Sequence, residues 1–186
     1  MDEGVKVTLP GHHRWVEKKP NQEYCIHLLW AEMEFDIKYG VIKRAKLSGV
    51  EAQADKKYKP AKNYQFTQSD EDWMLRMIDR AVGNVRSKLK NVVQHASRFA
   101  SDELLPKMKD YDIVLHYDGD VQWLGSADDV MNNIHEYVVD YCISDFLEMD
   151  GMTQQAERMM SRAEQALENA YDETNSVIIQ TPMFIL

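Results

Sequence analysis

The sequence predicts a mainly α protein: a four-helix bundle-like core with an inserted β-hairpin, an extended N-terminal arm and a C-terminal β-strand tail. Apolar residues recur every three or four positions in four long stretches, which is the helical period. Asp118-Gly119 separates two β-prone runs, as is typical of a tight hairpin, and the chain ends in an apolar run. The predicted units are an extended arm over residues 1–20, a helical domain over 21–174 with the hairpin at about 111–124, and a C-terminal tail over 175–186.

The arm is predicted from "VKVTLPGHHRWVEKKP", which combines two prolines, one glycine and mixed polarity. Val5, Val7 and Leu9 alternate as in a β-strand, but such a strand needs a partner to pair with. Residues 1–20 contain no continuous apolar stretch, so we expect neither a signal peptide nor a membrane span.

The first helix is expected over residues 21–46, where apolar side chains recur along one face. These residues are Ile26, Leu29, Trp30, Met33, Ile37 and Val41. A glycine, a proline and a lysine-rich run predict a loop or a frayed helix end over 47–66. The second helix is expected to begin with Ser69 as its cap, with Asp72 completing a capping-box-like start, and to end near Arg98.

The third helix is expected to begin with Ser126 as its cap and Asp129 three positions on, and to end near Gly151. A fourth helix is predicted over about residues 153–173, with alanines on its inner side. Because only a short turn separates these two helices, they should lie antiparallel.

Charge is unevenly distributed along this chain of 186 residues and net charge −9. Residues 1–101 hold 18 basic and 13 acidic side chains, whereas residues 102–186 hold 4 and 18. The asymmetry indicates either solvated helix faces of different sign or head-to-tail self-association, in which a basic face of one copy meets an acidic face of the next. Cys25 and Cys142 lie in apolar stretches and are predicted to be reduced core residues.

No motif predicts catalysis, a cofactor or a metal. His135 begins a pattern like that of a zinc-protease helix, but Val139 stands where the second histidine is required. A G-x-S-x-G elbow and a Walker-type phosphate loop are both absent from the sequence. Lysines interleaved with tyrosines over residues 46–64 leave open a DNA-proximal role beside the simpler interpretation of a solvated loop.

Four stretches follow one another in the chain: "EYCIHLLWAEMEFDIKYGVIKRAKL", "DEDWMLRMIDRAVGNVRSKL", "YDIVLHYDGD" leading into "IHEYVVDYCISDFLEM", and the alanine-rich "QQAERMMSRAEQALENAYDE". This layout resembles the head–tail connector (adaptor) proteins of tailed bacteriophages, over roughly residues 22–173. The resemblance implies a structural virion protein, assembled in the host cytoplasm. Such adaptors form a dodecameric ring beneath the portal protein in the phage neck, and genomic DNA passes through the channel without sequence-specific binding.

The resemblance also implies that a C-terminal segment docks on the portal or on a neighbouring subunit. We expect partner-binding residues in the tail and in the arm: Val177, Ile178, Ile179, Met183, Phe184, Ile185 and Leu186, with Val5, Val7, Leu9 and Trp15. The alternative for the tail is a last strand that folds back onto its own helices.

Two other functions stay open at this point. One is a soluble helical protein-interaction module of bacterial or prophage origin that forms no ring. The other is a small metal- or nucleotide-dependent enzyme. The leading hypothesis expects no enzyme activity, no cofactor, no metal and no membrane partner.

Overall fold

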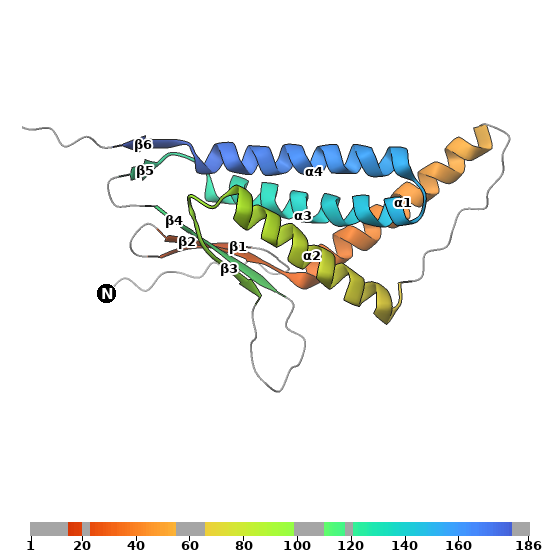
Figure 1. The fold of residues 1–186 in the computed structure, drawn as a ribbon, viewed down its shortest axis with the longest axis horizontal. Coiled ribbons are helices and arrows are strands. Elements are labelled where there is room, and N and C mark those ends of the chain that lie inside the picture. Colours follow the sequence, from red (N-terminus) through yellow and green to blue (C-terminus); the bar gives the residue numbers. More distant parts are fainter. Residues whose placement is uncertain (1–14, 20–22, 55–65, 99–109, 118–120, 180–186) are drawn as a thin grey trace, which may run out of the picture.

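The computed structural model describes residues 15–19, 23–54, 66–98, 110–117 and 121–179. These residues form a mainly helical fold, which confirms the mainly α part of the predicted fold class (Figure 1). In chain order the elements are β1 (Trp15–Lys19), β2 (Glu23–Leu28), α1 (Trp30–Ala54), α2 (Gln68–Lys88), β3 (Val93–Arg98), β4 (Tyr111–His116), β5 (Val121–Trp123), α3 (Ala127–Met149), α4 (Thr153–Thr174) and β6 (Val177–Ile179).

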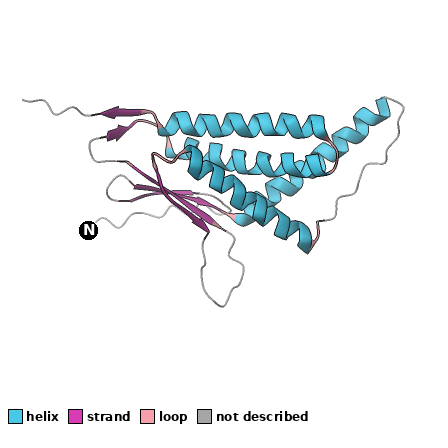
Figure 2. Cartoon of the chain, in the orientation of Figure 1, coloured by secondary structure: helices cyan, strands magenta, loops and turns pink. Residues whose placement is uncertain are grey.

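Four of the strands form an antiparallel sheet in the order β1-β2-β4-β3, beside the helices (Figure 2). This sheet corrects two predictions and adds a paired strand within the predicted arm. β1 occupies part of the predicted arm, β2 occupies the start of the predicted first helix, and β3 occupies the end of the predicted second helix. The physical reason is pairing: β4 hydrogen-bonds with β2, which lies far away in the sequence, and with β3.

The predicted hairpin at 111–124 is wrong. β4 and β5 flank Asp118-Gly119, but they belong to different sheets. Both edges of β4 are already paired, to β2 and to β3, so β4 has no edge left for β5. β5 instead pairs with β6, at the other end of the chain.

The third and fourth helices match their predictions. The Oγ of Ser126 accepts a hydrogen bond from the backbone N of Asp129 at 3.2 Å, so Ser126 caps α3 as expected. α3 ends at Met149, and Gly151 adopts a φ of 78°, a left-handed conformation that glycine reaches at little cost. α4 then runs antiparallel to α3, beside it along its whole length (Figure 1).

α2 begins two residues before its predicted start. Thr67, rather than Ser69, is the N-cap residue, and the backbone N of Thr67 donates to Asp70 Oδ2 at 2.6 Å. α2 therefore begins with a capping box, as predicted, but Thr67 and Asp70 form it instead of Ser69 and Asp72. α1 also continues to Ala54, beyond the predicted end of the first helix, and residues 55–65 of the predicted loop lie outside the described residues.

The core fills the space between the four-stranded sheet and the helices. Its largest fully buried side chains are Ile26, Leu28, Met33, Ile37, Met74, Ile78, Leu89, Ile113, Leu115, Ile134, Ile143 and Leu147. Each such side chain stabilises the fold by about 1.5–3 kcal/mol relative to exposure. Cys25 and Cys142 are buried and not disulfide-bonded, as predicted.

Candidate functional site

The structure describes four of the eleven predicted partner-binding residues. Val177, Ile178 and Ile179 form β6, and Trp15 begins β1. The two strands lie in different sheets, so the structure does not bring Trp15 and the tail together. The remaining seven are outside the described residues: Val5, Val7, Leu9, Met183, Phe184, Ile185 and Leu186.

β6 lies in a small two-stranded sheet with β5, just past the end of α4 (Figure 1). Three residue pairs join the strands: Val121 with Ile179, Gln122 with Ile178, and Trp123 with Val177. One further backbone hydrogen bond, from the N of Leu124 to the O of Ser176 at 2.8 Å, extends this ladder. Val177 nevertheless remains 38% exposed. The start of the tail thus pairs with a strand of its own chain, but Val177 is only partly covered there.

An aromatic cluster of Tyr24, Tyr117 and Trp123 anchors β5 to the rest of the fold. The rings of Tyr117 and Trp123 stack at 5.0 Å between centroids, and the ring of Tyr24 meets Trp123 edge-on at 4.8 Å. Tyr117 is almost fully buried, and its hydroxyl donates to the O of Thr174 at 3.2 Å. Burial raises the pKa of Tyr117 far above its ordinary value, so its hydroxyl keeps its proton. The cluster joins both sheets to the end of α4.

Glu173 fixes the junction between α4 and β6. Its backbone O accepts a hydrogen bond from Trp123 Nε1 at 2.7 Å, and its side chain accepts one from the N of Ser126 at 3.3 Å. Gly125 sits against this junction, because a Cβ there would collide with the Glu173 carbonyl and the Trp123 ring. Several contacts therefore hold the seat of β6, by which we mean Trp123, Gly125 and Glu173, even though Val177 is partly exposed.

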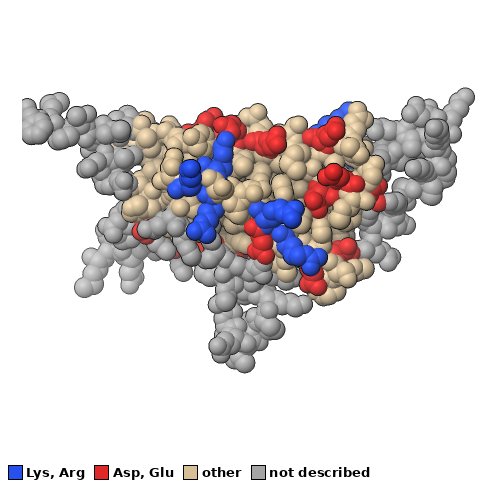
Figure 3. Space-filling view, viewed as in Figure 1, with Lys and Arg blue, Asp and Glu red and all other residues tan. Residues whose placement is uncertain are grey.

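Opposite charges lie near this end of the molecule. The stretch 80–88 of α2 exposes Arg80, Arg86 and Lys88 and contains no acidic residue. The neighbouring part of α4 exposes Glu164, Glu168 and Asp172. Basic side chains gather over α2 and acidic ones follow α4 in Figure 3. One pair is satisfied within the chain: Lys88 Nζ lies 2.5 Å from Glu168 Oε2.

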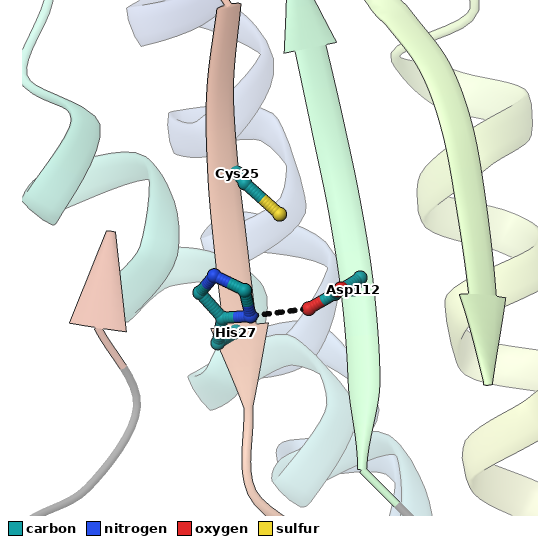
Figure 4. A group of neighbouring side chains, drawn as sticks. All are labelled: Cys25, His27 and Asp112. Carbon is teal, nitrogen blue, oxygen red and sulfur yellow. Dashed lines mark ion pairs between the residues drawn. The ribbon is translucent and has the colours of Figure 1, made fainter. Parts of the chain in front are cut away.

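A second group of side chains lies between β2 and β4. Cys25 and His27 are two apart on β2, so they point to the same face of the sheet. Asp112 is the register partner of His27 on β4, and its carboxylate forms an ion pair with His27 Nδ1 (Figure 4). The thiol, imidazole and carboxylate each offer one ligand atom, all within 4.8 Å of one another. We call Cys25, His27 and Asp112 the Cys–His–Asp cluster.

The cluster is largely shielded from water. Cys25 is 1% exposed, and the side chains of His27 and Asp112 are 12% and 14% exposed. Glu17 on β1 is the register partner of Cys25, and its Oε2 lies 3.8 Å from His27 Nε2. This cluster was not predicted, because residues 21–46 were expected to form one helix, in which positions two apart face different directions. The signal was the Cys-x-His spacing, which places two ligand types together only on a strand.

A third group, Glu32, Asp36 and His135, joins α1 to α3. His135 is buried, and its Nε2 lies 2.9 Å from Asp36 Oδ2. The two acids are four residues apart and thus share a helix face. This group contains no thiol.

Asp140 of α3 is a buried acid, only 4% exposed. Burial raises its pKa to about 6, although the guanidinium groups of Arg162 and Arg44 act in the opposite direction. Arg162 Nη2 lies 3.3 Å from Asp140 Oδ2 and donates to Glu136 Oε1 at 2.7 Å. These charges tie α4 and α1 to α3, and we assign them a structural role.

Comparison of the chain with protein-family profiles, with characterised proteins and with solved structures gives no significant match. Among the helices in the described part of the chain, none has both the length and the apolar composition to cross a membrane.

Proposed function

We propose that this chain is a head–tail connector (adaptor) protein, a structural component that forms a ring in the neck of a tailed phage and joins the portal to the tail. One observation carries the proposal. The apolar C-terminal segment begins as a strand held by three residue pairs, in a sheet separate from the main one. A two-stranded sheet is marginally stable by itself in water, so further pairing at this point would add stability.

The geometry of the β5–β6 sheet suits strand addition from another chain. Each strand of a two-stranded sheet pairs along one edge, and among the described residues no third strand joins either one. An open edge with apolar side chains is a template for another strand. A portal segment or a neighbouring subunit would extend the sheet, with Val177 among the contacts.

The contacts that hold the seat of β6 support docking at this point. The Tyr24–Tyr117–Trp123 cluster and the Glu173 hydrogen bonds fix the direction in which β6 leaves α4. A pre-organised strand loses less conformational entropy on binding than a free one. In a closed ring the same contact recurs at every subunit interface, so even a modest stabilisation per contact adds up over the whole ring.

The charge distribution supports the same assembly. Arg80 and Arg86 of α2 and the acidic face of α4 are complementary, and only part of this complementarity is used within the chain. Opposite faces that meet head-to-tail favour heterologous contacts, which close into a ring when the rotation between successive subunits closes. An acidic channel wall would also repel the DNA backbone and let the genome slide.

Co-purification with the portal protein encoded in the same genome tests the proposal. We expect a stable complex in which electron microscopy shows a ring with a central channel, a dodecamer if the resemblance holds. A chain truncated after Asn175 should lose the complex while keeping its helical circular dichroism. If the truncated chain binds portal as tightly as the full chain, the tail does not carry the docking.

A second candidate is a protein-interaction module that forms no ring. The pairing of β6 with β5 of its own chain favours this candidate, because the start of the tail is already seated without a neighbour. A module would remain a monomer or dimer with portal present and would bind a different partner through the same strand.

A further inference from the structure

We propose that the Cys–His–Asp cluster binds a single Zn²⁺ ion through Cys25 Sγ, a ring nitrogen of His27 and the carboxylate of Asp112. The ion would clamp β2 to β4, the two central strands of the sheet, on the face opposite Ile26 and Leu28. This inference is independent of the proposed neck function, and it departs from the sequence-based expectation of no metal.

The strand geometry brings the three donors together before any ion binds. Residues two apart on a strand project from the same face, and the directly opposite residue on an antiparallel neighbour has its Cβ about 4.5–5.5 Å away. Cys25 and His27 fulfil the first condition, and His27 and Asp112 fulfil the second. The side chains converge beside the gap between β2 and β4 (Figure 4), with their ligand atoms within 4.8 Å.

The donor types select zinc among the common divalent ions. Zn²⁺ takes thiolate, imidazole and carboxylate ligands in a tetrahedron, whereas Mg²⁺ and Ca²⁺ require oxygen ligands in larger number. Three protein ligands leave a fourth position for water. The Glu17 carboxylate of β1 lies 3.8 Å from His27 Nε2, on the other side of the ring from the Nδ1 that faces Asp112. Coordination needs a deprotonated thiol, so zinc binding should release protons and weaken in acid.

The burial of the cluster also favours a structural ion over a reactive site. Cys25 is 1% exposed, which denies a substrate access to the thiol. A structural zinc site is closed, and its binding free energy becomes folding free energy. Since access from solvent is poor, the ion is expected to enter during folding.

The test uses Co²⁺ in place of zinc, because the absorption spectrum of bound Co²⁺ shows which kinds of ligand hold it. The full chain is unfolded with reductant and chelator, refolded with Co²⁺, and examined by absorption spectroscopy. We expect one Co²⁺ per chain, with tetrahedral visible bands and a near-ultraviolet sulfur-to-cobalt charge-transfer band. Zn²⁺ should then displace Co²⁺ and abolish both features.

Matched variants assign the bands. Cys25→Ser should abolish the charge-transfer band, whereas Cys142→Ala, which removes the other buried thiol, should retain it. Asp112→Asn should weaken Co²⁺ binding while the thiolate band remains detectable at higher metal concentration. Each variant is checked for native circular dichroism, and the wild-type spectrum decides the matter even where a variant fails to fold.

Three results would overturn the proposal. The first is wild-type protein that refolds in the presence of Co²⁺ and binds no Co²⁺. The second is a band that survives Cys25→Ser and disappears in Cys142→Ala. The third is Co²⁺ binding without any thiolate band, which would place the ion at a thiol-free group such as Glu32, Asp36 and His135.

Discussion

Asp140 shows how one buried charge affects the stability of the fold. Its ordinary pKa of 3.8 rises to about 6 because burial disfavours the carboxylate. The folded chain therefore binds this proton more tightly than the unfolded chain does. The resulting stabilisation is complete below about pH 4 and is lost as the pH rises through about 6.

Asp140→Asn is expected to stabilise the fold at pH 7, because asparagine mimics the protonated acid. The gain should reach at most about 3 kcal/mol in the free energy of unfolding and should vanish near pH 4. Urea denaturation of wild type and variant at several pH values measures this difference. Glu157→Gln, an exposed acid of α4, is the control and should produce little change. A variant that is less stable than wild type at pH 7 would show that the ion pair with Arg162 dominates.

Gly40 allows α1 to pack closely against α3. A Cβ at this position would collide with Cδ1 of Ile143, the residue that packs against it. Gly40→Ala should therefore destabilise the fold by about 1–3 kcal/mol in spite of the better helix propensity of alanine. Ile143→Val removes the colliding methyl. The double variant should therefore lose less free energy of unfolding than the two single variants lose in total.

Gly83 provides the control for Gly40. It also lies inside a helix, but no atom lies within 4 Å of a Cβ built there. Gly83→Ala should stabilise the fold by about 0.5–1 kcal/mol. Thermal or chemical unfolding of the four variants measures all of these effects, and equal costs at the two glycines would contradict the close packing of α1 on α3.

At the scale of the elements, a helix or strand could be predicted where nearby residues alone determine it. α3 has its own N-cap, and α3 and α4 carry their periodicity and their connecting turn within about fifty residues, so both were predicted. Residues 23–28 have apolar residues at spacings that fit both a strand and a helix. These residues form a strand because they pair with β4, more than eighty residues further on. The local sequence does not reveal this pairing.

The sites follow the same rule. The start of the tail is a local feature, so its apolar character and its strand were predicted. Its partner β5 was not, because the Asp-Gly signal indicated a local hairpin instead. The Cys–His–Asp cluster combines β2 with β4 and required the correct strand assignment and register.

The β5–β6 sheet should depend on the hydrogen bond from Trp123 Nε1 to the O of Glu173. Trp123→Phe keeps an aromatic ring but removes the donor, which should cost about 1 kcal/mol and loosen the seat of β6. Amide hydrogen exchange of Val177–Ile179 should accelerate, while exchange in α3 stays slow. Leu124→Ala is the control, because this side chain is 54% exposed and should not affect exchange in β6. Equal exchange in wild type and Trp123→Phe would show that the aromatic cluster does not hold the strand.

At the scale of the whole molecule, the proposed ring combines two surfaces of one subunit. Arg80 and Arg86 lie on one and the acidic face of α4 forms the other. If these surfaces meet between subunits, assembly should weaken as salt concentration rises, because screening reduces attraction between exposed charges. The double variant Arg80→Glu and Arg86→Glu should then reduce ring formation, and a matching reversal on α4 should restore part of it. A ring that is insensitive to both salt and charge reversal would exclude this contact.

Native mass spectrometry of the full chain tests the central claim most directly, alone and after mixing with the portal protein of the same genome. A role as a neck ring predicts a single closed oligomer of many identical subunits, formed alone or on addition of portal. It also predicts that truncation after Asn175 leaves a folded chain that does not assemble. A full chain that stays monomeric or dimeric under both conditions would contradict the assignment as a neck ring.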